Sequence, residues 1–326
     1  MVLRNNPKIS ATTRRRVRKI AERLGYKPDA RVAELMSYLS SNRRLHREAC
    51  LGVISFYEDA RPWERSMHLK HIYEGMTNRA NALGYRLEPI WLRAPGMTYR
   101  RICSILDARG IQGLLSFGSP KFDEEFPPEF NHYAVVTQGL SIKTSLHRVI
   151  NDAYDDTQKI LHRVYQIGAR RPGLVLGHYE NVRGGHSNLS AYLGWCQEML
   201  GTPLVVPVLR LSRAEEKPLL AWLMRHKPDV LILVHIPEMI AALTAILERQ
   251  GLSHLPQKIG MAVLSQTLQG TDLSGFEENG TLMGEWAMEL LVGRIMNHDF
   301  GVPVHPKIQM VGGRWVDGKS LPEKIG

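Results

Sequence analysis

From residue 51 onward, short apolar runs alternate with longer amphipathic segments, and this alternation constrains the fold more than any other feature. Runs bounded by turn residues, such as 51–57 and 230–234, are typical of strands that are buried on both faces. The segments between them carry apolar residues three and four positions apart, which predicts helices. Strands that alternate with helices predict an α/β protein with parallel sheets.

The pattern runs twice along the chain. The first round has expected strands at 51–57, 87–92, 111–117 and 133–138, and expected helices at 67–83 and around Ile102 and Leu106. The second begins near Asn151, with expected helices at 157–167, 190–200, 215–226 and 239–250 and strands at 173–176, 204–209, 230–234 and 259–263. A late helix at 285–296 and a last strand at 307–311 follow. We therefore expect two lobes, each with a doubly wound parallel sheet.

The excess positive charge lies at the N-terminus. The chain has a net charge of +10, and residues 1–47 hold 13 Lys and Arg against 3 Asp and Glu, whereas residues 48–326 hold 29 of each sign. A basic arm on a neutral body indicates a polyanion partner such as nucleic acid. A solubilising tail is the alternative interpretation.

Other features argue against whole classes of protein. The apolar runs are far shorter than a membrane span, so we expect no membrane partner. The N-terminal residues lack the apolar segment of a secretory signal. Cys50, Cys103 and Cys196 each lie beside apolar residues, which is typical of reduced thiols, and we expect a cytoplasmic protein.

The basic arm has the pattern of a helix at residues 10–24. Ser10 is a suitable N-cap and Gly25 a suitable stop. One face is apolar and the rest is basic; the apolar residues are Val17, Ile20, Ala21 and Leu24. A second short helix is expected at 29–39. Because a helix of about fifteen residues is marginal in water, both must pack on a partner or become ordered on binding.

The order and spacing of several motifs in this arm carry a family resemblance. The motifs are Asn5-Asn6-Pro7, Thr13-Arg14-x-Arg16-Val17, Leu24-Gly25-Tyr26-x-Pro28 and the later Leu35. Together they resemble the third headpiece helix and the hinge of the lactose/purine-repressor (LacI/GalR) transcription regulators. The resemblance implies a helix-turn-helix in the major groove and paired hinge helices in the minor groove, with Leu35 as a wedge between base steps. Packing in a core or a dimer is the alternative role of Leu35.

The resemblance also assigns contacts and domains. It implies that operator DNA is contacted by Arg4, Asn5, Asn6, Arg14, Tyr26, Arg31 and Leu35. By comparison about twenty headpiece residues are missing, so we expect an N-terminally truncated helix-turn-helix headpiece, with a true start upstream of Met1 as the alternative. The implied fold has a partial all-α headpiece and hinge at 1–47, and a periplasmic-binding-protein-like core. Its N-terminal lobe would comprise 48–151 and 278–304, with the late helix. Its C-terminal lobe would comprise 152–277 and 305–326, with the last strand. We expect a homodimer.

An effector cleft is expected between the lobes, at the carboxyl ends of the strands. Side chains just after expected strands and at the crossover are its candidates: Tyr57, Trp63, Ser119, Gln138, Asn151, Arg183, His186, Asn188, Trp195, His235 and Ser265. Aromatic faces with a few polar groups suit a sugar or a base-like metabolite. The alternative for each candidate is an ordinary loop residue that does not contact an effector.

Two ligand positions of the family are not kept. The Arg-x-x-Gly-Phe motif appears here as Ala191-Tyr-Leu-Gly194-Trp195, so the arginine that clamps the effector is absent. The aspartate of a Gly-Tyr-Asp motif is absent near Ser265. Arg183 and His186 are the candidate substitutes, and a vestigial site is the alternative.

Enzyme motifs are missing from the sequence. It holds no Gly-x-Ser-x-Gly, no P-loop and no Gly-x-Gly-x-x-Gly after an expected strand. His68, His71 and Glu74 share helical spacing, but no HExxH or cysteine partner accompanies them. We therefore expect no catalytic residue, no metal and no cofactor.

The combined interpretation is a ligand-responsive, DNA-binding transcription regulator, with repression as the expected action. Its core would bind a small sugar-like metabolite and control the contact of the hinge helices with the operator. The alternative is a sugar-binding sensor that has lost DNA binding.

Overall fold

The computed structural model describes Thr12, Arg16, Lys19, Ile20 and Arg23, and residues 49–325 apart from 122, 204, 235, 236, 253–258 and the side chain of Glu180. The chain divides into two compact units, residues 1–48 and 49–326. The five described residues of the first unit are helical and exposed, in agreement with the helix expected at 10–24. All seven expected DNA contacts, from Arg4 to Leu35, lie outside the described residues, as does the helix expected at 29–39.

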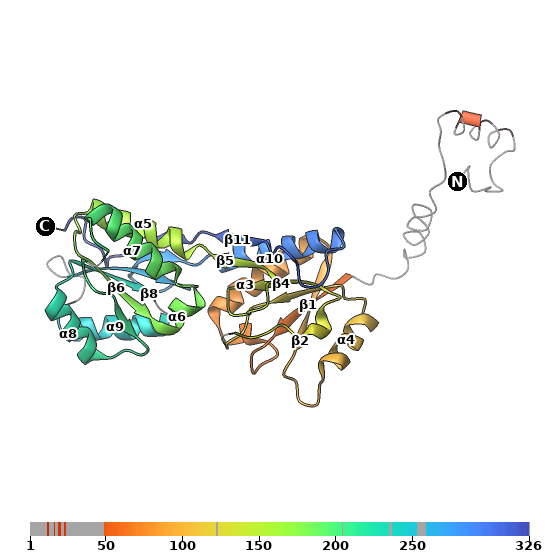
Figure 1. The fold of residues 1–326 in the computed structure, drawn as a ribbon, viewed down its shortest axis with the longest axis horizontal. Helices are drawn as coiled ribbons and strands as arrows, with labels where there is room; N and C mark the ends of the chain where they lie inside the picture. The colour runs from red at the N-terminus through yellow and green to blue at the C-terminus, as the bar shows by residue number, and fades with distance from the viewer. Residues whose placement is uncertain are drawn as a thin grey trace. The chain divides into compact units, whose positions relative to one another are not determined.

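The second unit contains two lobes, each built on a parallel sheet (Figure 1). The sheet of the first lobe has the order β11-β5-β4-β3-β1-β2. Its strands are β1 (Ala49–Ser55), β2 (Tyr85–Trp91), β3 (Gly113–Ser116), β4 (Ala134–Gln138), β5 (His147–Asn151) and β11 (Ile308–Val311). One face carries α3 (Met67–Ala82) and α10 (Gly280–Met296), and the other carries α4 (Tyr99–Ala108) and the 3-10 turn η4 (Pro128–Phe130). A further 3-10 turn, η3 (Pro62–Glu64), precedes α3.

Glycines allow α3 and α10 to approach closely. A Cβ atom on Gly75 would lie 1.9 Å from the carbonyl oxygen of Thr281, and one on Gly284 would lie 2.1 Å from that of Ile72. The backbones therefore touch, and the side chains around them, including Met76 and Leu291, are fully buried. This close packing joins a helix from the beginning of the lobe to one from near the end of the chain.

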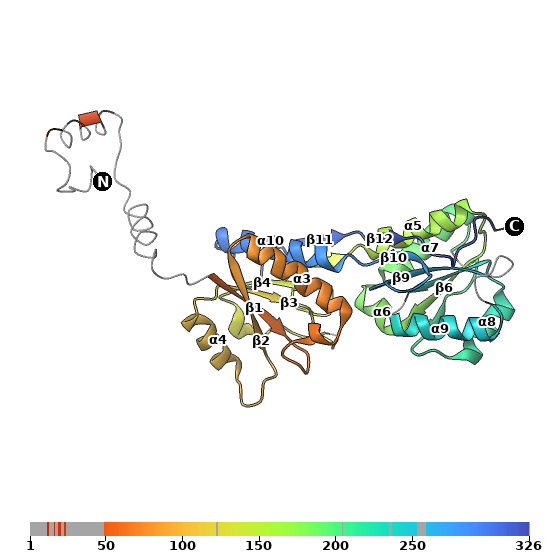
Figure 2. The same cartoon turned by 180° about the vertical axis from the view of Figure 1, so that it is seen from behind.

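The second lobe has the sheet order β12-β10-β9-β8-β6-β7. Its strands are β6 (Pro172–Gly177), β7 (Leu209–Leu211), β8 (Val230–Val234), β9 (Gly260–Ser265), β10 (Ser274–Glu277) and β12 (Arg314–Val316), and β12 alone is antiparallel to its neighbour. The helices α5 (Ala153–Gln166) and α7 (Ser187–Leu200) cover one face, and α8 (Glu216–His226) and α9 (Pro237–Arg249) cover the other (Figure 2). The short helix α6 (His178–Arg183) directly follows β6.

Three crossovers connect the lobes: β5 to α5, β10 to α10, and β11 to β12. Hydrogen bonds tie the first of these crossovers to the third. The amide of Asp152 donates to the carbonyl of Val311 at 2.8 Å. The amide of Gly313 donates to both carboxylate oxygens of Asp156, at 3.0 and 2.9 Å. The expected fold class, two doubly wound parallel-sheet lobes, is therefore confirmed.

Two expected strands are corrected by the structure. Within the strand expected at 204–209, residues 205–208 are not in a strand, and pairing begins only at Leu209. Pro207 lacks the N–H that a ladder needs, and its carbonyl instead accepts from the indole of Trp222 at 2.7 Å. The expected division of the chain assigns β11 to the C-terminal lobe, yet β11 pairs with β5 in the first sheet. The return to the second lobe is made after Gly312-Gly313 by β12.

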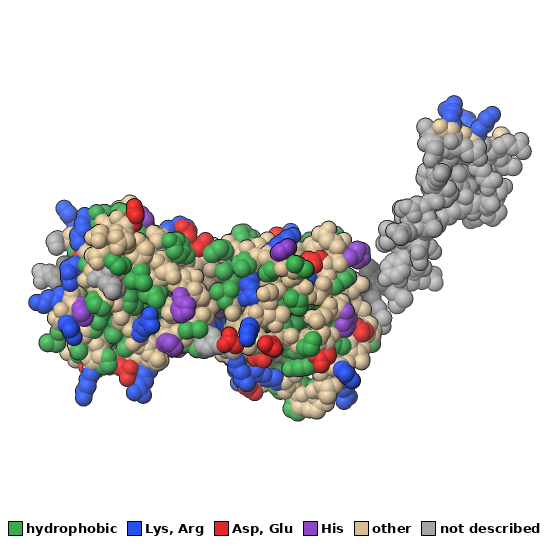
Figure 3. Space-filling model, viewed as in Figure 1, with side chains coloured by type: hydrophobic (Ala, Val, Ile, Leu, Met, Phe, Trp, Pro, Cys, Tyr) green, Lys and Arg blue, Asp and Glu red, His purple; other side chains and the backbone are tan. Residues whose placement is uncertain are grey.

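None of the helices in the described part of the chain is long and apolar enough to cross a bilayer. On the face of the second unit in Figure 3, acidic and basic side chains lie close together on the first lobe. This agrees with the balanced charge of residues 48–326.

Candidate effector site

A cavity of about 310 Å³ lies between the lobes, where the carboxyl ends of their strands meet. The first lobe contributes side chains after β1 and β4 and along α3, the second contributes α6 and the ends of β8 and β9, and the crossovers complete the lining. Six of the expected effector residues line it: Tyr57, Gln138, Asn151, Arg183, Asn188 and Ser265.

Two expected aromatic residues lie in the hydrophobic cores instead. Trp63 is buried in the core of the first lobe, where its ring stacks on that of Tyr73 with 4.0 Å between ring centroids. Trp195 is 2% exposed and faces α5, where its indole N–H donates to His162 at 3.1 Å. Both side chains gain more from burial against a helix than from facing the cleft.

The other expected residues also lie away from the cavity lining. His186 is exposed, adopts a φ of +63°, and contacts the amide of Asn181 at 2.8 Å. Ser119 is buried in the loop after β3, where its hydroxyl donates to Glu124 at 2.8 Å. His235 lies outside the described residues.

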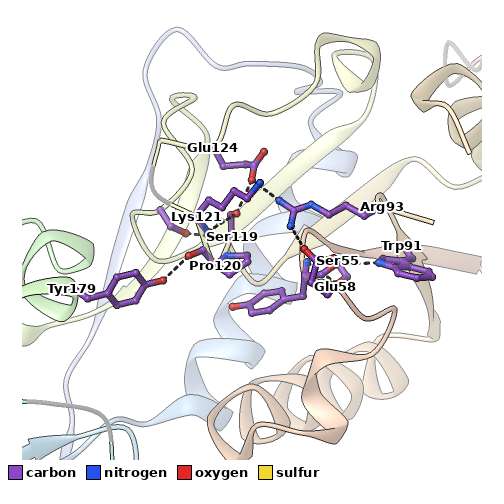
Figure 4. A network of polar contacts seen from close by, with 11 residues as sticks. Ser55, Glu58, Trp91, Arg93, Ser119, Pro120, Lys121, Glu124 and Tyr179 are labelled. Atoms are coloured by element: carbon purple, nitrogen blue, oxygen red, sulfur yellow. Dashed lines mark hydrogen bonds and ion pairs between the residues drawn. The ribbon is translucent and has the colours of Figure 1, made fainter. Parts of the chain in front are cut away.

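A network of polar contacts joins the loops that follow β1, β2 and β3. Figure 4 shows Arg93 between two carboxylates, donating to Glu58 and Glu124 at 3.0 Å each. The indole of Trp91 donates to the carbonyl of Tyr57 at 3.1 Å, so the network supports a residue of the cavity lining. The hydroxyl of Tyr179 reaches across from α6 and donates to the carbonyl of Pro120 at 2.6 Å.

Arg183 is the cation of the cavity lining. Its guanidinium donates to the hydroxyl of Tyr179 at 2.9 Å and also hydrogen-bonds Tyr57. Burial raises the pKa of Tyr57, so this phenol is neutral at neutral pH. Within the described part of the chain, no carboxylate forms an ion pair with Arg183.

His68 and Glu278 form an unusual pair beside Arg183. The Nδ1 of His68 lies 3.4 Å from Oε2 of Glu278, yet it has no hydrogen-bond partner of good geometry among the described residues. Burial lowers the pKa of His68 to about 4, with Arg183 and His71 acting in the same direction. Burial also raises the pKa of Glu278 to about 7, although Arg183 opposes this. The contact is therefore not an ion pair of two full charges at neutral pH.

Two buried polar side chains of the lining have no hydrogen-bond partner among the described residues. Both amide atoms of Gln138 are unpaired, and this residue is 3% exposed. The hydroxyl of Ser265 is also unpaired, and this residue is 3% exposed as well. An unpaired buried polar group costs about 1–3 kcal/mol. Gln138 ends β4 in the first lobe and Ser265 ends β9 in the second, so a ligand that pairs with both connects the lobes.

Three residues of this site are absent from the expected set: His68, Tyr179 and Glu278. His68 was considered only as part of a metal site, but Glu74 pairs with Lys70, and His71 lines a different cavity. Among the described residues, no group of three metal-ligating side chains gathers. Tyr179 lies in α6, which directly follows β6, and Glu278 directly follows β10; the sequence pattern did not predict α6 or β10. Their position just after a strand is the signal that would have found them.

Comparisons with known proteins place this geometry in context. No family model matches the chain, and no curated protein sequence matches it. Solved structures do match. The transcriptional regulator CelR in complex with cellobiose has a TM-score of 0.64 and 17% identity, over 98% of this chain and 94% of that one.

Two further structures show the same similarity. The lac repressor dimer bound to operator and the anti-inducer ONPF has a TM-score of 0.60 and 15% identity, over 98% of this chain and 93% of that one. A periplasmic binding protein/LacI transcriptional regulator from Alkaliphilus metalliredigens QYMF, complexed with D-xylulofuranose, has a TM-score of 0.58 and 13% identity, over 83% and 98%. As the sequence resemblance implied, the chain has the fold of the LacI-family transcription regulators.

Proposed function

We propose that the chain is a DNA-binding transcription regulator that responds to a small sugar-like metabolite, with repression as its action. The cavity carries this proposal, because it is lined from the strand ends of both lobes and contains buried polar atoms without partners. The regulator fold and the basic arm support it. A neighbour bound to cellobiose and another bound to operator agree with this role.

The proposed mechanism is a shift in population between arrangements of the lobes. Gln138 belongs to the first lobe, whereas Arg183 and Ser265 belong to the second. A ligand that contacts all three stabilises the arrangement in which they converge. That arrangement then favours or disfavours ordered hinge helices on DNA, which couples the two binding events.

In this proposal the chain acts as a homodimer, and the arm contacts DNA through Arg4, Asn5, Asn6, Arg14, Tyr26, Arg31 and Leu35. Leu35 enters the minor groove between base steps, and the cationic residues neutralise phosphates. The core binds its effector through Tyr57, Gln138, Asn151, Arg183, Asn188 and Ser265. No catalytic step is part of the proposal.

The test is fluorescence anisotropy of a pool of labelled duplex DNA, titrated with the full chain over a salt series. We expect binding whose logarithm falls steeply with the logarithm of salt concentration. Combining Arg14→Gln with Arg31→Gln removes two cations that the proposal places on phosphates, so the magnitude of that slope should fall by about 2. The exposed Arg225 in the second lobe offers the matched control, and Arg225→Gln should leave the slope unchanged.

Leu35→Ala tests the insertion of Leu35 between base steps separately from the contacts of the basic residues with phosphates. We expect weaker binding with an unchanged salt slope, because no phosphate contact is lost. Absence of binding at low salt by the unaltered chain would overturn the proposal and favour a small-molecule sensor without DNA binding.

A further inference from the structure

We infer that the effector of this cavity is a small hydroxylated anion, a molecule of monosaccharide size that carries a carboxylate or phosphate group held by Arg183. This inference rests on the proposed function and narrows its sugar-like ligand to a charged class. It follows from three features of the lining: a cation without a counter-ion, a weakly acidic neighbour, and two unpaired polar side chains.

The first feature is the state of Arg183. The residue ends α6 and lines the cavity, and its partners there are the phenol groups of Tyr57 and Tyr179. A guanidinium has five N–H donors in a planar fork, which matches the two oxygens of a carboxylate or phosphate. Neither partner is a carboxylate, and among the described residues no carboxylate forms an ion pair with Arg183. A charge that is largely removed from water favours a partner of opposite sign.

The second feature is the low acidity of Glu278, the only carboxyl group in the described lining. Burial raises the pKa of Glu278 to about 7, so this carboxyl holds its proton more readily than an exposed one and offsets the charge of Arg183 only in part. His68, with a pKa lowered to about 4, adds no positive charge in that range. The described lining therefore carries a net positive charge at neutral pH, which an anionic ligand neutralises.

The third feature indicates hydroxyl groups on the ligand. The side-chain amide of Gln138 offers N–H donors and an acceptor oxygen, and the hydroxyl of Ser265 can donate and accept. None of these atoms has a hydrogen-bond partner among the described residues. A ligand hydroxyl both donates and accepts, so it suits either side chain. Phe117 and Tyr57 supply apolar surface for the ligand carbons. The cavity volume of about 310 Å³ lies at the lower end for ligand sites, which favours a monosaccharide-sized molecule.

The experiment is isothermal titration of the full chain with five probes. Gluconate and galacturonate present a carboxylate, glucose 6-phosphate presents a phosphate, and glucose and galactose are the neutral controls. We expect at least one anion to bind 10-fold or more tightly than its neutral counterpart, because a charged hydrogen-bonded pair contributes that much. The carboxylate and phosphate probes then separate the two sources of anionic oxygen.

Variants identify the groups responsible. Arg183→Gln should weaken anion binding by about 10- to 100-fold and change neutral sugar binding by less than about 2-fold. Arg183→Lys keeps the charge and should retain a preference for the anion. Gln138→Ala should weaken anions and neutral sugars alike. The exposed Arg225→Gln is the control, and thermal unfolding confirms that each variant is folded.

The outcomes separate this inference from the proposed function. Neutral sugars that bind as tightly as the anions, with no effect of Arg183→Gln, would overturn the charged class but leave a sugar-responsive regulator. Failure of all five probes to bind would also overturn it, whereas salt-dependent binding of duplex DNA would still support the regulator.

Discussion

The lobes are joined differently on the two sides of the cavity. On the crossover side, Gly313 donates two hydrogen bonds to Asp156, which is 1% exposed, and Asp152 is bonded to Val311. On the cleft side, the bridging groups belong to the short helix α6, where the half-exposed Tyr179 reaches Pro120. Partly buried hydrogen bonds open less often than exposed ones, which exchange with water. The comparison indicates a hinge at the crossovers and an opening at the cleft.

The largest effect is expected from a substitution in the close packing of α3 against α10, next to the crossover from β10 to α10. Gly284→Ala places a Cβ atom 2.1 Å from the carbonyl oxygen of Ile72, so we expect a loss of more than about 3 kcal/mol in unfolding free energy. Gly293→Ala is the control in the same helix, because its Cβ meets no atom within 4 Å. It should stabilise the protein by about 0.5–1 kcal/mol. Urea unfolding of both variants would measure the two changes in unfolding free energy. Equal changes would contradict the close contact of α3 and α10 at Gly284.

The second prediction concerns the pH dependence of the crossover. Burial raises the pKa of Asp156 to about 7, above the value of about 3.9 for an unfolded chain. The folded protein therefore binds more protons between these values. The stability that this group contributes is fully present below pH 4 and is lost as the pH rises to 7, by roughly 4 kcal/mol.

Asp156→Asn removes this titration and keeps an acceptor for Gly313. We expect the variant to gain stability relative to the unaltered protein between pH 5 and 7.5 in urea unfolding. A difference that stays constant with pH would show that the carboxyl is ionised throughout.

A smaller effect is expected from the first-lobe wall of the cleft. Arg93→Ala leaves Glu124 beside Ser119 without its cation, and we expect a loss of about 1 kcal/mol. The control is Arg65→Ala, since the ion pair of Arg65 with Asp59 is largely exposed and should contribute less than about 0.5 kcal/mol. Thermal unfolding compares the two variants, and equal losses would argue against a cooperative network.

The smallest effect on stability is expected at the cleft bridge. Tyr179→Phe removes the hydrogen bond to Pro120 and should cost less than about 0.5 kcal/mol. Amide hydrogen exchange in residues 117–121 should nevertheless become faster, because the bridge to α6 is lost. Unchanged exchange would show that the lobes are held in place without this bridge. Tyr154→Phe, at an exposed tyrosine on α5, is the control.

Most of the fold followed from apolar patterning, and the exceptions have physical causes. The run at 230–234 became β8 because all five side chains are buried. The strand β5 was missed because it begins with His147 and Arg148, which look polar in sequence but are buried. Arg148 donates to the carbonyl oxygens of Leu146, Gly139, Ile142 and Thr144, and a sequence cannot show that such partners exist.

The candidate site was only partly predictable for a related reason. The carboxyl ends of the expected strands identified Gln138 and Ser265, since the parallel strands of a sheet all end at the same edge of that sheet. It did not distinguish Tyr57, which lines the cavity, from Trp63, which turns into the core. That choice depends on the neighbouring helix, here the ring of Tyr73 on α3. Glu278 became a site residue through β10, whose four residues are too short for a clear pattern.

The late position of α10 in the sequence affects how the protein is made. The core of the first lobe includes Met283, Leu291 and Val311, so it cannot close until almost the whole chain has left the ribosome. The cores of the second lobe come mainly from residues 160–276 and are nearly complete earlier. Domains generally fold as units during synthesis. The lobe that is translated first is therefore the last to be completed, and until then its apolar strands lack the cover of α10.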